Sequence, residues 1–206
     1  MADVQTLERQ VSDAYLAAVG VGRRYRIASW AEITPELRDD VAAYCQNIDQ
    51  HMRDGYGLTL VGGVGTGKTC ALVLVADAAL AVRWPYGRYG DQPVTKPATV
   101  EWMLGPVLYR ILHRPDQRHH RERIAAFEAA DLLIIDDFDR LYATEWDVMQ
   151  LEALMELRHS EKRSVCLSLN SLDLLRQPEL ERTLDRLREN SDIVQLADDV
   201  QSRRGG

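Results

Sequence analysis

The segment Gly62-Gly-Val-Gly-Thr-Gly67-Lys68-Thr69 is the most informative part of the sequence. It matches the pattern G-x-x-x-x-G-K-[ST] in full. Glycines let the backbone adopt positive φ and turn its N–H groups inward, with no side chain in the way of a phosphate. Lys68 offers a point charge to the β- and γ-phosphates of ATP, and Thr69 offers a hydroxyl to Mg²⁺. We therefore expect ATP to contact Gly62, Gly63, Val64, Gly65, Thr66, Gly67, Lys68, Thr69 and Cys70.

The sequence on either side of this loop gives the context that phosphate binding requires. The apolar run Gly57-Leu-Thr-Leu-Val-Gly62 predicts a strand that enters the loop, and a helical pattern begins at Lys68 and lasts to about Val82. A helix that starts at the loop directs its N-terminal partial positive charge at the same anion. The alternative interpretation, a glycine-rich turn with a surface lysine, does not require this order of strand, loop and helix.

Strands and helices alternate along the rest of the chain. Helical spacing and capping signals predict helices over residues 3–19, 35–53, 106–113, 118–130, 145–160 and 178–189. Apolar runs predict strands over residues 99–103, 132–136, 163–169 and 193–196. Glycine and proline recur through residues 83–97, which we expect to be irregular. The alternation predicts an α/β fold, a parallel sheet with helices on both faces.

The first helix stands apart from this pattern. We expect residues 1–21 to form a short N-terminal amphipathic helix and residues 22–206 to form the α/β domain. A narrow apolar stripe runs along the helix, made of Val4, Leu7, Val11, Ala14 and Ala18. Such a stripe suits the groove of a partner protein, or it packs on the chain's own core. The sequence leaves both interpretations open.

A second motif carries acidic side chains. Leu132-Leu-Ile-Ile-Asp136-Asp137 is an apolar strand that ends in two carboxylates. In open α/β sheets the carboxyl ends of the strands face the ligand crevice. Asp136 is therefore expected to support Mg²⁺, and Asp137 to orient or deprotonate the attacking water. The alternative is an acidic loop after a core strand.

Asn170 ends the strand predicted over residues 163–169, where an amide could contact the γ-phosphate and report its presence. The alternative is a turn or helix cap, since asparagine is common there. Further along, Arg182 and Arg186 lie on a helix rich in Asp and Arg. An arginine that projects from a helix can complete a neighbour's active site, because its guanidinium binds phosphate oxygens in a fork. A helix of surface ion pairs explains the same pattern.

Composition excludes several classes of protein. The net charge of −7 argues against broad electrostatic affinity for nucleic acid, so any such contact must be local. No stretch approaches the ~20 apolar residues that span a bilayer, so we expect no membrane partner. Three widely spaced cysteines favour a reduced, cytoplasmic protein.

Taken together, these motifs resemble the DnaC/IstB group of AAA+ proteins, which are bacterial helicase loaders and transposition helpers. The segments that carry the resemblance are Gly22-Arg-Arg-Tyr-Arg-Ile-Ala-Ser-Trp, Gly63-Val-Gly-Thr-Gly-Lys-Thr, Leu132-Leu-Ile-Ile-Asp-Asp-Phe, Ser168-Leu-Asn170 and Asp185-Arg186-Leu187. The resemblance implies a P-loop NTPase with an AAA+ core and no full C-terminal helical lid. It also implies ATP hydrolysis at subunit boundaries in a head-to-tail homo-oligomer.

The resemblance assigns further residues. It makes Asn170 the sensor, Arg186 the arginine finger and Arg182 a second contact in trans. The two helices expected between residues 103 and 131 match an inserted helix that faces the central channel in the group, so Arg118, Arg121 and Arg123 are candidates for DNA contact.

The resemblance also implies a role. We expect a DNA-associated ATPase whose assembly is switched by ATP and which loads a replicative helicase, with single-stranded DNA as its substrate. The alternative is a transposition helper that stimulates a transposase at double-stranded target DNA. A small-molecule P-loop kinase and a nucleotide-binding adaptor without catalysis are the rivals from other classes.

Overall fold

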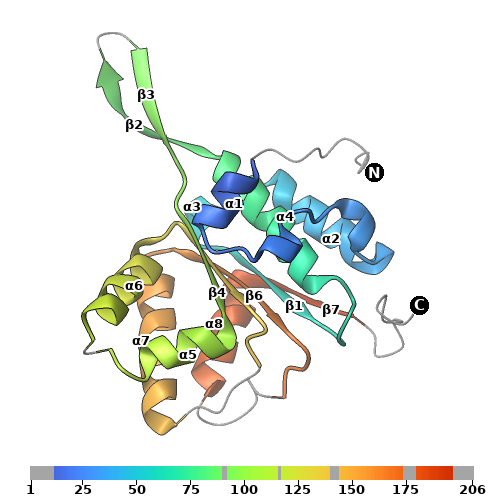
Figure 1. Cartoon of the computed structure of the whole chain (residues 1–206), viewed down its shortest axis with the longest axis vertical. Helices are drawn as coiled ribbons and strands as arrows, with labels where there is room; N and C mark the ends of the chain where they lie inside the picture. The colour runs from blue at the N-terminus through green and yellow to red at the C-terminus, as the bar shows by residue number, and fades with distance from the viewer. Residues whose placement is uncertain (1–11, 90–91, 116, 140–143, 174–179, 197–206) are drawn as a thin grey trace.

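A parallel sheet of five strands forms the centre of the molecule (Figure 1). The computed structural model describes residues 12–89, 92–115, 117–139, 144–173 and 180–196. The strands lie in the order β4 (Val100–Leu104), β5 (Leu132–Asp136), β6 (Ser164–Leu169), β1 (Gly57–Val61) and β7 (Ser191–Gln195). Every neighbouring pair is parallel. The chain therefore has the expected α/β architecture.

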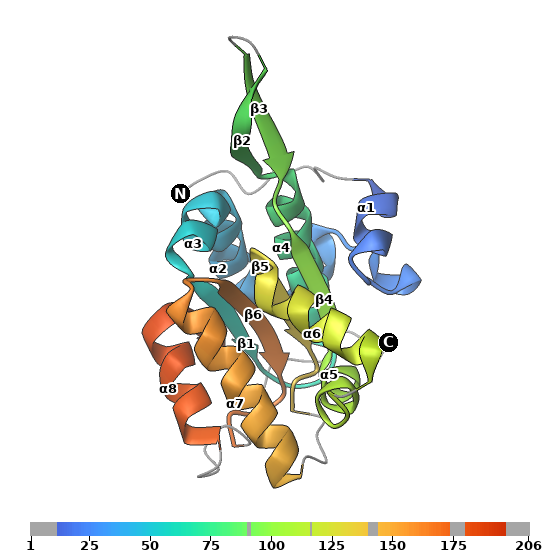
Figure 2. The same cartoon turned by 90° about the vertical axis from the view of Figure 1, so that its left-hand side faces the viewer.

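Helices cover the two faces of this sheet and create two hydrophobic cores (Figure 2). One face is covered by α1 (Asp13–Ala18), α2 (Pro35–Gln46), α3 (Ile48–Asp54) and α4 (Lys68–Ala81). The other face is covered by α5 (Gly105–Leu112), α6 (Arg118–Ala129), α7 (Glu145–Ser160) and α8 (Glu181–Asn190). Because both faces are covered, every residue of β1, β5 and β6 is buried, and these strands are apolar runs rather than alternating ones.

Most predicted elements agree with the structure to within two or three residues, and Thr144 and Asp147 form a capping box at the start of α7. The single helix expected over residues 35–53 is two helices, α2 and α3. They break at Asn47, whose side chain donates a hydrogen bond to the carbonyl of Ala43 at 3.0 Å. Such a local bond competes with a continuous helix.

The N-terminal helix is described only in part. Residues 3–11 of the predicted helix lie outside the described residues, and α1 covers Asp13–Ala18. Leu16 of α1 is completely buried in the core beside α4, and the backbone N–H of Trp102 donates to the carbonyl of Val19 at 3.1 Å. Where the structure describes this helix, it packs against the α/β domain.

The expectation for residues 83–97 was wrong. They form an antiparallel hairpin of β2 (Arg83–Tyr89) and β3 (Gln92–Pro97), which projects from the domain (Figure 1). Proline lacks a backbone N–H, but both strands of an isolated ribbon are edge strands, where proline is tolerated. The irregularity that glycine and proline introduce is a bulge between Pro85 and Gly87.

The described part of the chain ends just after the sheet. No helix follows β7 within these residues, which end at Leu196. Among them, no helix has both the length and the apolar character needed to cross a bilayer.

Candidate nucleotide-binding site

The glycine loop connects the end of β1 to the first turn of α4, as the sequence predicts. Beside it lies a pocket of about 450 Å³. Its lining comprises Arg24, Tyr25, Ala31, Glu32, Val64, Gly65, Thr66, Gly67, Lys68, Thr69, Cys70, Asp137 and Asn170. Four segments far apart in the sequence thus meet at the carboxyl edge of the sheet, where open α/β folds bind their ligands.

Two glycines of the loop are required by their surroundings. Gly67 has a φ of +94°, and a Cβ there would lie 2.8 Å from the carbonyl oxygen of Glu32. A Cβ on Gly62 would lie 2.9 Å from the Cβ of Leu196. The loop is therefore fixed from two sides, by the short 3₁₀ helix η3 (Trp30–Glu32) and by the residue that follows β7.

Lys68 is buried at the centre of the loop. Its ammonium donates to the carbonyls of Gly62 at 2.6 Å and Gly63 at 2.9 Å, and the amide oxygen of Asn170 lies 3.4 Å away. Gly62 and Gly63 thus contribute to the site through these carbonyls and do not line the pocket. The charge of Lys68 is held at the floor of the loop, where phosphate oxygens would replace neutral carbonyl partners.

The Asp136 carboxylate is buried behind Thr69 and does not itself line the pocket. It accepts hydrogen bonds from the hydroxyl of Thr69 at 3.2 Å and from that of Ser168 at 2.6 Å. Burial raises the pKa of Asp136, the Ser168 bond lowers it, and the neighbouring Asp137 raises it again, so that the pKa lies above its ordinary value. A hydroxyl and a carboxylate side by side are hard oxygen ligands of the kind that Mg²⁺ takes, so Thr69 and Asp136 fit this ion.

Asp137 faces the pocket because its backbone takes an unusual conformation. Its φ is +54°, in the left-handed region, which aspartate tolerates better than most residues. Its N–H donates to the hydroxyl of Ser168 at 3.0 Å. Gly105 packs so closely that a Cβ there would lie 2.6 Å from the carbonyl oxygen of Asp137. The turn after β5 is therefore fixed by β6 and by the start of α5.

Some residues of the site were missed by the sequence analysis. Ser168 connects Asp136 to the turn that holds Asp137, a role that the sequence analysis did not assign to it. Asp139 accepts from the backbone N–H of Asn170 at 2.8 Å and from its side-chain amide at 3.2 Å, which orients the amide. Arg24 and Tyr25, both in the segment quoted for the resemblance, line the pocket. The contacts of Ser168 and Asp139 arise because β5 and β6 are adjacent, which no local spacing reveals.

The structure places Arg186 and Arg182 away from this pocket. They line a separate cavity of about 590 Å³ between α7 and α8, and the two cavities share no residue. The guanidinium of Arg186 pairs with Glu156 at 3.1 Å and Glu189 at 3.2 Å. These hydrogen bonds and charges raise the pKa of Arg186. Within one chain, Arg186 therefore does not contribute to the nucleotide pocket.

The three arginines considered for DNA contact lie together on α6. Arg118 pairs with Glu122 at 3.1 Å, and Arg123 pairs with Glu101 at 3.0 Å while its guanidinium lies 4.9 Å from the ring centroid of Phe127. Arg121 is exposed. None of the three lines the nucleotide pocket, so any contact they make with DNA is separate from nucleotide binding.

Neither a known protein-family profile nor a curated protein sequence matches the chain. Solved structures do match. The DnaC helicase loader is 16% identical, with a TM-score of 0.66 over 85% of this chain and 100% of that one. DnaI is 16% identical, with a TM-score of 0.66 over 87% of this chain and 96% of that one.

The replication initiator DnaA bound to AMPPCP and single-stranded DNA is 15% identical, with a TM-score of 0.62 over 95% of this chain and 53% of that one. Identities this low establish the fold and nothing beyond it. The chain has the P-loop AAA+ fold that DnaC-type helicase loaders share with DnaA.

Proposed function

We propose that this chain binds Mg²⁺–ATP at the glycine loop and hydrolyses it. One observation carries the proposal: Lys68, Thr69, Asp137 and Asn170 line a single pocket, and Asp136 lies directly behind Thr69. A cation for phosphates, two oxygen ligands for a metal ion, a carboxylate for water and an amide are the groups that phosphoryl transfer uses.

Each residue has a role in this mechanism. Lys68 exchanges its carbonyl partners for the β- and γ-phosphate oxygens and neutralises their charge. Thr69 and Asp136 would hold Mg²⁺, which would supply further neutralisation of the phosphate oxygens. Asp137 orients the attacking water and accepts its proton, while Asn170, held by Asp139, contacts the γ-phosphate.

We further propose that Arg186 completes the site of a neighbouring copy in a head-to-tail homo-oligomer, with Arg182 as a second contact. The surface beside these arginines supports this proposal. Trp146, Met149 and Leu157 are exposed on one side of α7, and Met149 lines the same cavity as Arg186. Exposed apolar side chains that adjoin an arginine suit a protein interface. Glu156 and Glu189 would hold the guanidinium extended until a nucleotide arrives from the neighbour.

The biological role proposed here is loading of a replicative helicase onto DNA, with ATP as the switch for assembly. The matched structures include helicase loaders and an initiator bound to an ATP analogue and single-stranded DNA. Arg118, Arg121 and Arg123 are the proposed DNA contacts on α6. The resemblance to transposition helpers supports the second candidate, an ATPase that stimulates a transposase at double-stranded target DNA.

Nucleotide binding by the Lys68→Ala variant tests the central proposal. No other lysine lies in the loop to neutralise the phosphates, so we expect loss of measurable Mg²⁺–ATP binding by titration calorimetry, with an unchanged melting temperature. ATP affinity near that of the parent would overturn the assignment of the loop. Co-purification with a replicative helicase or with a transposase distinguishes the two biological roles.

A further inference from the structure

The β2–β3 hairpin plays no part in the nucleotide site. It follows α4 and precedes β4, so it emerges at the amino edge of the parallel strands, opposite the carboxyl edge where the glycine loop lies. Figures 1 and 2 both show it extending beyond the helices that cover the sheet. Since this ribbon packs against no other element along most of its length and lies far from the nucleotide site, a different role must come from its own side chains.

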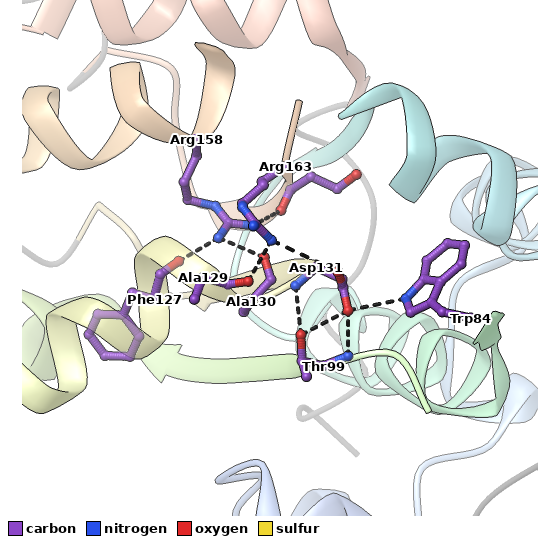
Figure 3. Close-up of polar contacts among 9 residues, drawn as sticks. Trp84, Thr99, Phe127, Ala129, Ala130, Asp131, Arg158 and Arg163 are labelled. Carbon is purple, nitrogen blue, oxygen red and sulfur yellow. Dashed lines mark hydrogen bonds and ion pairs between the residues drawn. The ribbon is translucent and has the colours of Figure 1, made fainter. Parts of the chain in front are cut away.

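The base of the hairpin is firmly attached to the domain (Figure 3). The indole N–H of Trp84 donates to the Asp131 carboxylate at 3.1 Å, and the same carboxylate oxygen accepts from the N–H and the hydroxyl of Thr99 at 2.8 Å each. The guanidinium of Arg53 lies 4.7 Å from the centroid of the Trp84 ring. Trp84 of β2 and Thr99, just beyond the end of β3, therefore attach the base of the ribbon to Asp131.

The bulge gathers aromatic side chains on one face. Gly87 pairs with Val94, and Tyr89 pairs with Gln92, whereas Tyr86 has no partner of its own. In a regular strand, Tyr86 and Tyr89 would point to opposite faces, since side chains alternate. The extra residue at the bulge puts both on the face that also carries Val94 and Lys96. Tyr86 is 72% exposed and Tyr89 is 85% exposed.

The same hairpin is positively charged, although the whole chain carries a net charge of −7. Residues 83–97 contain three cations, Arg83, Arg88 and Lys96, against one acidic residue, Asp91. The ammonium of Lys96 lies 5.8 Å from the ring centroid of Tyr86, beside the aromatic face. Cations next to exposed rings complement a polyanion whose bases can stack.

We propose that the hairpin face formed by Tyr86, Tyr89, Val94 and Lys96 binds single-stranded nucleic acid. Unpaired bases stack on the two tyrosine rings, and Lys96 contacts the phosphates on that face. Arg83 and Arg88 pair with Pro97 and Pro93, so they lie on the opposite face and add only longer-range attraction. A single strand is favoured over a duplex because the faces of paired bases are already covered by their neighbours, whereas an unpaired base can stack on an aromatic ring. A protein partner would also use tyrosine, but the excess of three cations over one acidic residue in residues 83–97 favours a polyanion. The inference rests on the proposed association with DNA and does not depend on ATP hydrolysis.

Fluorescence anisotropy with a labelled oligothymidine of about 20 nucleotides tests this proposal on the full chain. We expect the double variant Tyr86→Ala/Tyr89→Ala to bind about tenfold more weakly or worse, and Tyr86→Phe/Tyr89→Phe to bind within about twofold of the parent, because phenylalanine keeps the ring. Tyr15→Ala is the matched control, since Tyr15 is 54% exposed on α1. Lys96→Gln should lower the slope of log affinity against log salt by about 0.7.

The possible results separate this inference from the proposed function. A parent that binds no oligonucleotide overturns both the hairpin site and the association with DNA. If the parent binds the oligonucleotide and the double alanine variant binds it equally well, only the hairpin site is overturned. The α6 arginines would then be the remaining proposed DNA contact. The double alanine variant is also tested with a duplex of the same sequence. If its affinity for the duplex falls as much as its affinity for the single strand, the proposed preference for single strands is overturned.

Two further measurements cover the remaining outcomes. The first is capture of a replicative helicase by the Tyr86→Ala/Tyr89→Ala variant. If this variant binds the oligonucleotide as the parent does but no longer captures the helicase, the face is a protein-docking site and the proposal is overturned. Photocrosslinking with 5-iodouracil oligonucleotides, mapped by mass spectrometry, does not depend on the fold of any variant. Crosslinks at Tyr86 or Tyr89 support the site, and crosslinks elsewhere alone contradict it.

Discussion

At the scale of single residues, the site depends on carboxylates whose orientation is fixed by neighbours. Asp137 is the clearest example, because its φ is positive and most other residues at this position would strain the backbone. Asparagine has the same size and also tolerates the left-handed region. Asp137→Asn therefore removes the basic carboxylate while it keeps the turn after β5, and any loss of activity can be attributed to the lost charge.

We expect Asp137→Asn to bind Mg²⁺–ATP within about twofold of the parent and to hydrolyse it at least about 100-fold more slowly, since a general base contributes a factor of this order. A phosphate-release assay at saturating ATP measures the rate, and calorimetry measures the affinity. Turnover at the parent's rate would mean that another residue positions the water.

Ser168 gives a prediction that the sequence alone did not suggest. Its hydroxyl contacts the Asp136 carboxylate at 2.6 Å and receives the N–H of Asp137 at 3.0 Å. Because such supporting contacts orient metal ligands, we expect Ser168→Ala to weaken the Mg²⁺-dependent part of ATP affinity roughly tenfold. ATP affinity in EDTA should stay the same. Ser171→Ala, just beyond β6, is the control, and equal effects of the two substitutions would remove Ser168 from the site.

At the scale of elements, local chemistry and long-range packing differ in how far they could be predicted. The glycine loop, the Asp136–Asp137 pair and the strand before Asn170 follow from short patterns, because each places its functional group by its own spacing. The hairpin of β2 and β3 could not be predicted by the same reasoning. Glycine and proline are strand breakers inside a sheet, and nothing local shows that residues 83–97 form an isolated ribbon.

Arg158 is the clearest case of a role that a local pattern conceals. In the sequence it is one of many charged residues of α7, yet the structure buries it completely. Its guanidinium donates to the carbonyls of Phe127, Ala130 at 3.0 Å and Ser164 at 2.6 Å (Figure 3). Burial lowers the pKa of Arg158 to about 9, which is still above neutral pH, and the guanidinium therefore stays charged. This arginine connects α7 to the end of α6 and to the start of β6.

Replacement of Arg158 should therefore destabilise the fold. We expect Arg158→Met to lower the free energy of unfolding by about 3 kcal/mol or more, because it leaves three buried carbonyls without a donor. Arg158→Lys should recover only part of this loss, since an ammonium cannot reproduce the planar fork. Arg163→Met is the control: Arg163 contacts the carbonyl of Ala129 and Asp131 at a partly exposed site, and its loss should be about 1 kcal/mol or less. Urea denaturation measures the free energy of unfolding of the three variants. Equal losses of stability in Arg158→Met and Arg163→Met would show that the buried hydrogen bonds of Arg158 are not specially important.

At the scale of the whole molecule, the separation of the two cavities is the main feature. The nucleotide pocket lies at the carboxyl edge of the sheet, and the cavity with Arg186 lies between α7 and α8. If Arg186 takes part in ATP hydrolysis, as proposed, it must act on the pocket of a neighbouring copy. The exposed side of α7 next to Arg186 would then be buried in the assembly, which explains Trp146 and Met149 on the surface.

A mixing experiment tests this composite site. Arg186→Ala should bind ATP normally and lose roughly 10³-fold or more of its activity, the contribution of arginine fingers in related enzymes. Asp137→Asn is inactive for a different reason, but it binds ATP and still carries Arg186. In a mixed oligomer, its Arg186 completes the intact pocket of an Arg186→Ala neighbour, so activity should rise and then fall as the ratio of the two variants changes. Arg188→Ala, which removes another exposed arginine of α8 paired with Asp185, is the control and should keep parental activity. Size-exclusion chromatography establishes that the two variants co-assemble, and co-assembly without any recovery of hydrolysis would show that Arg186 does not act between subunits.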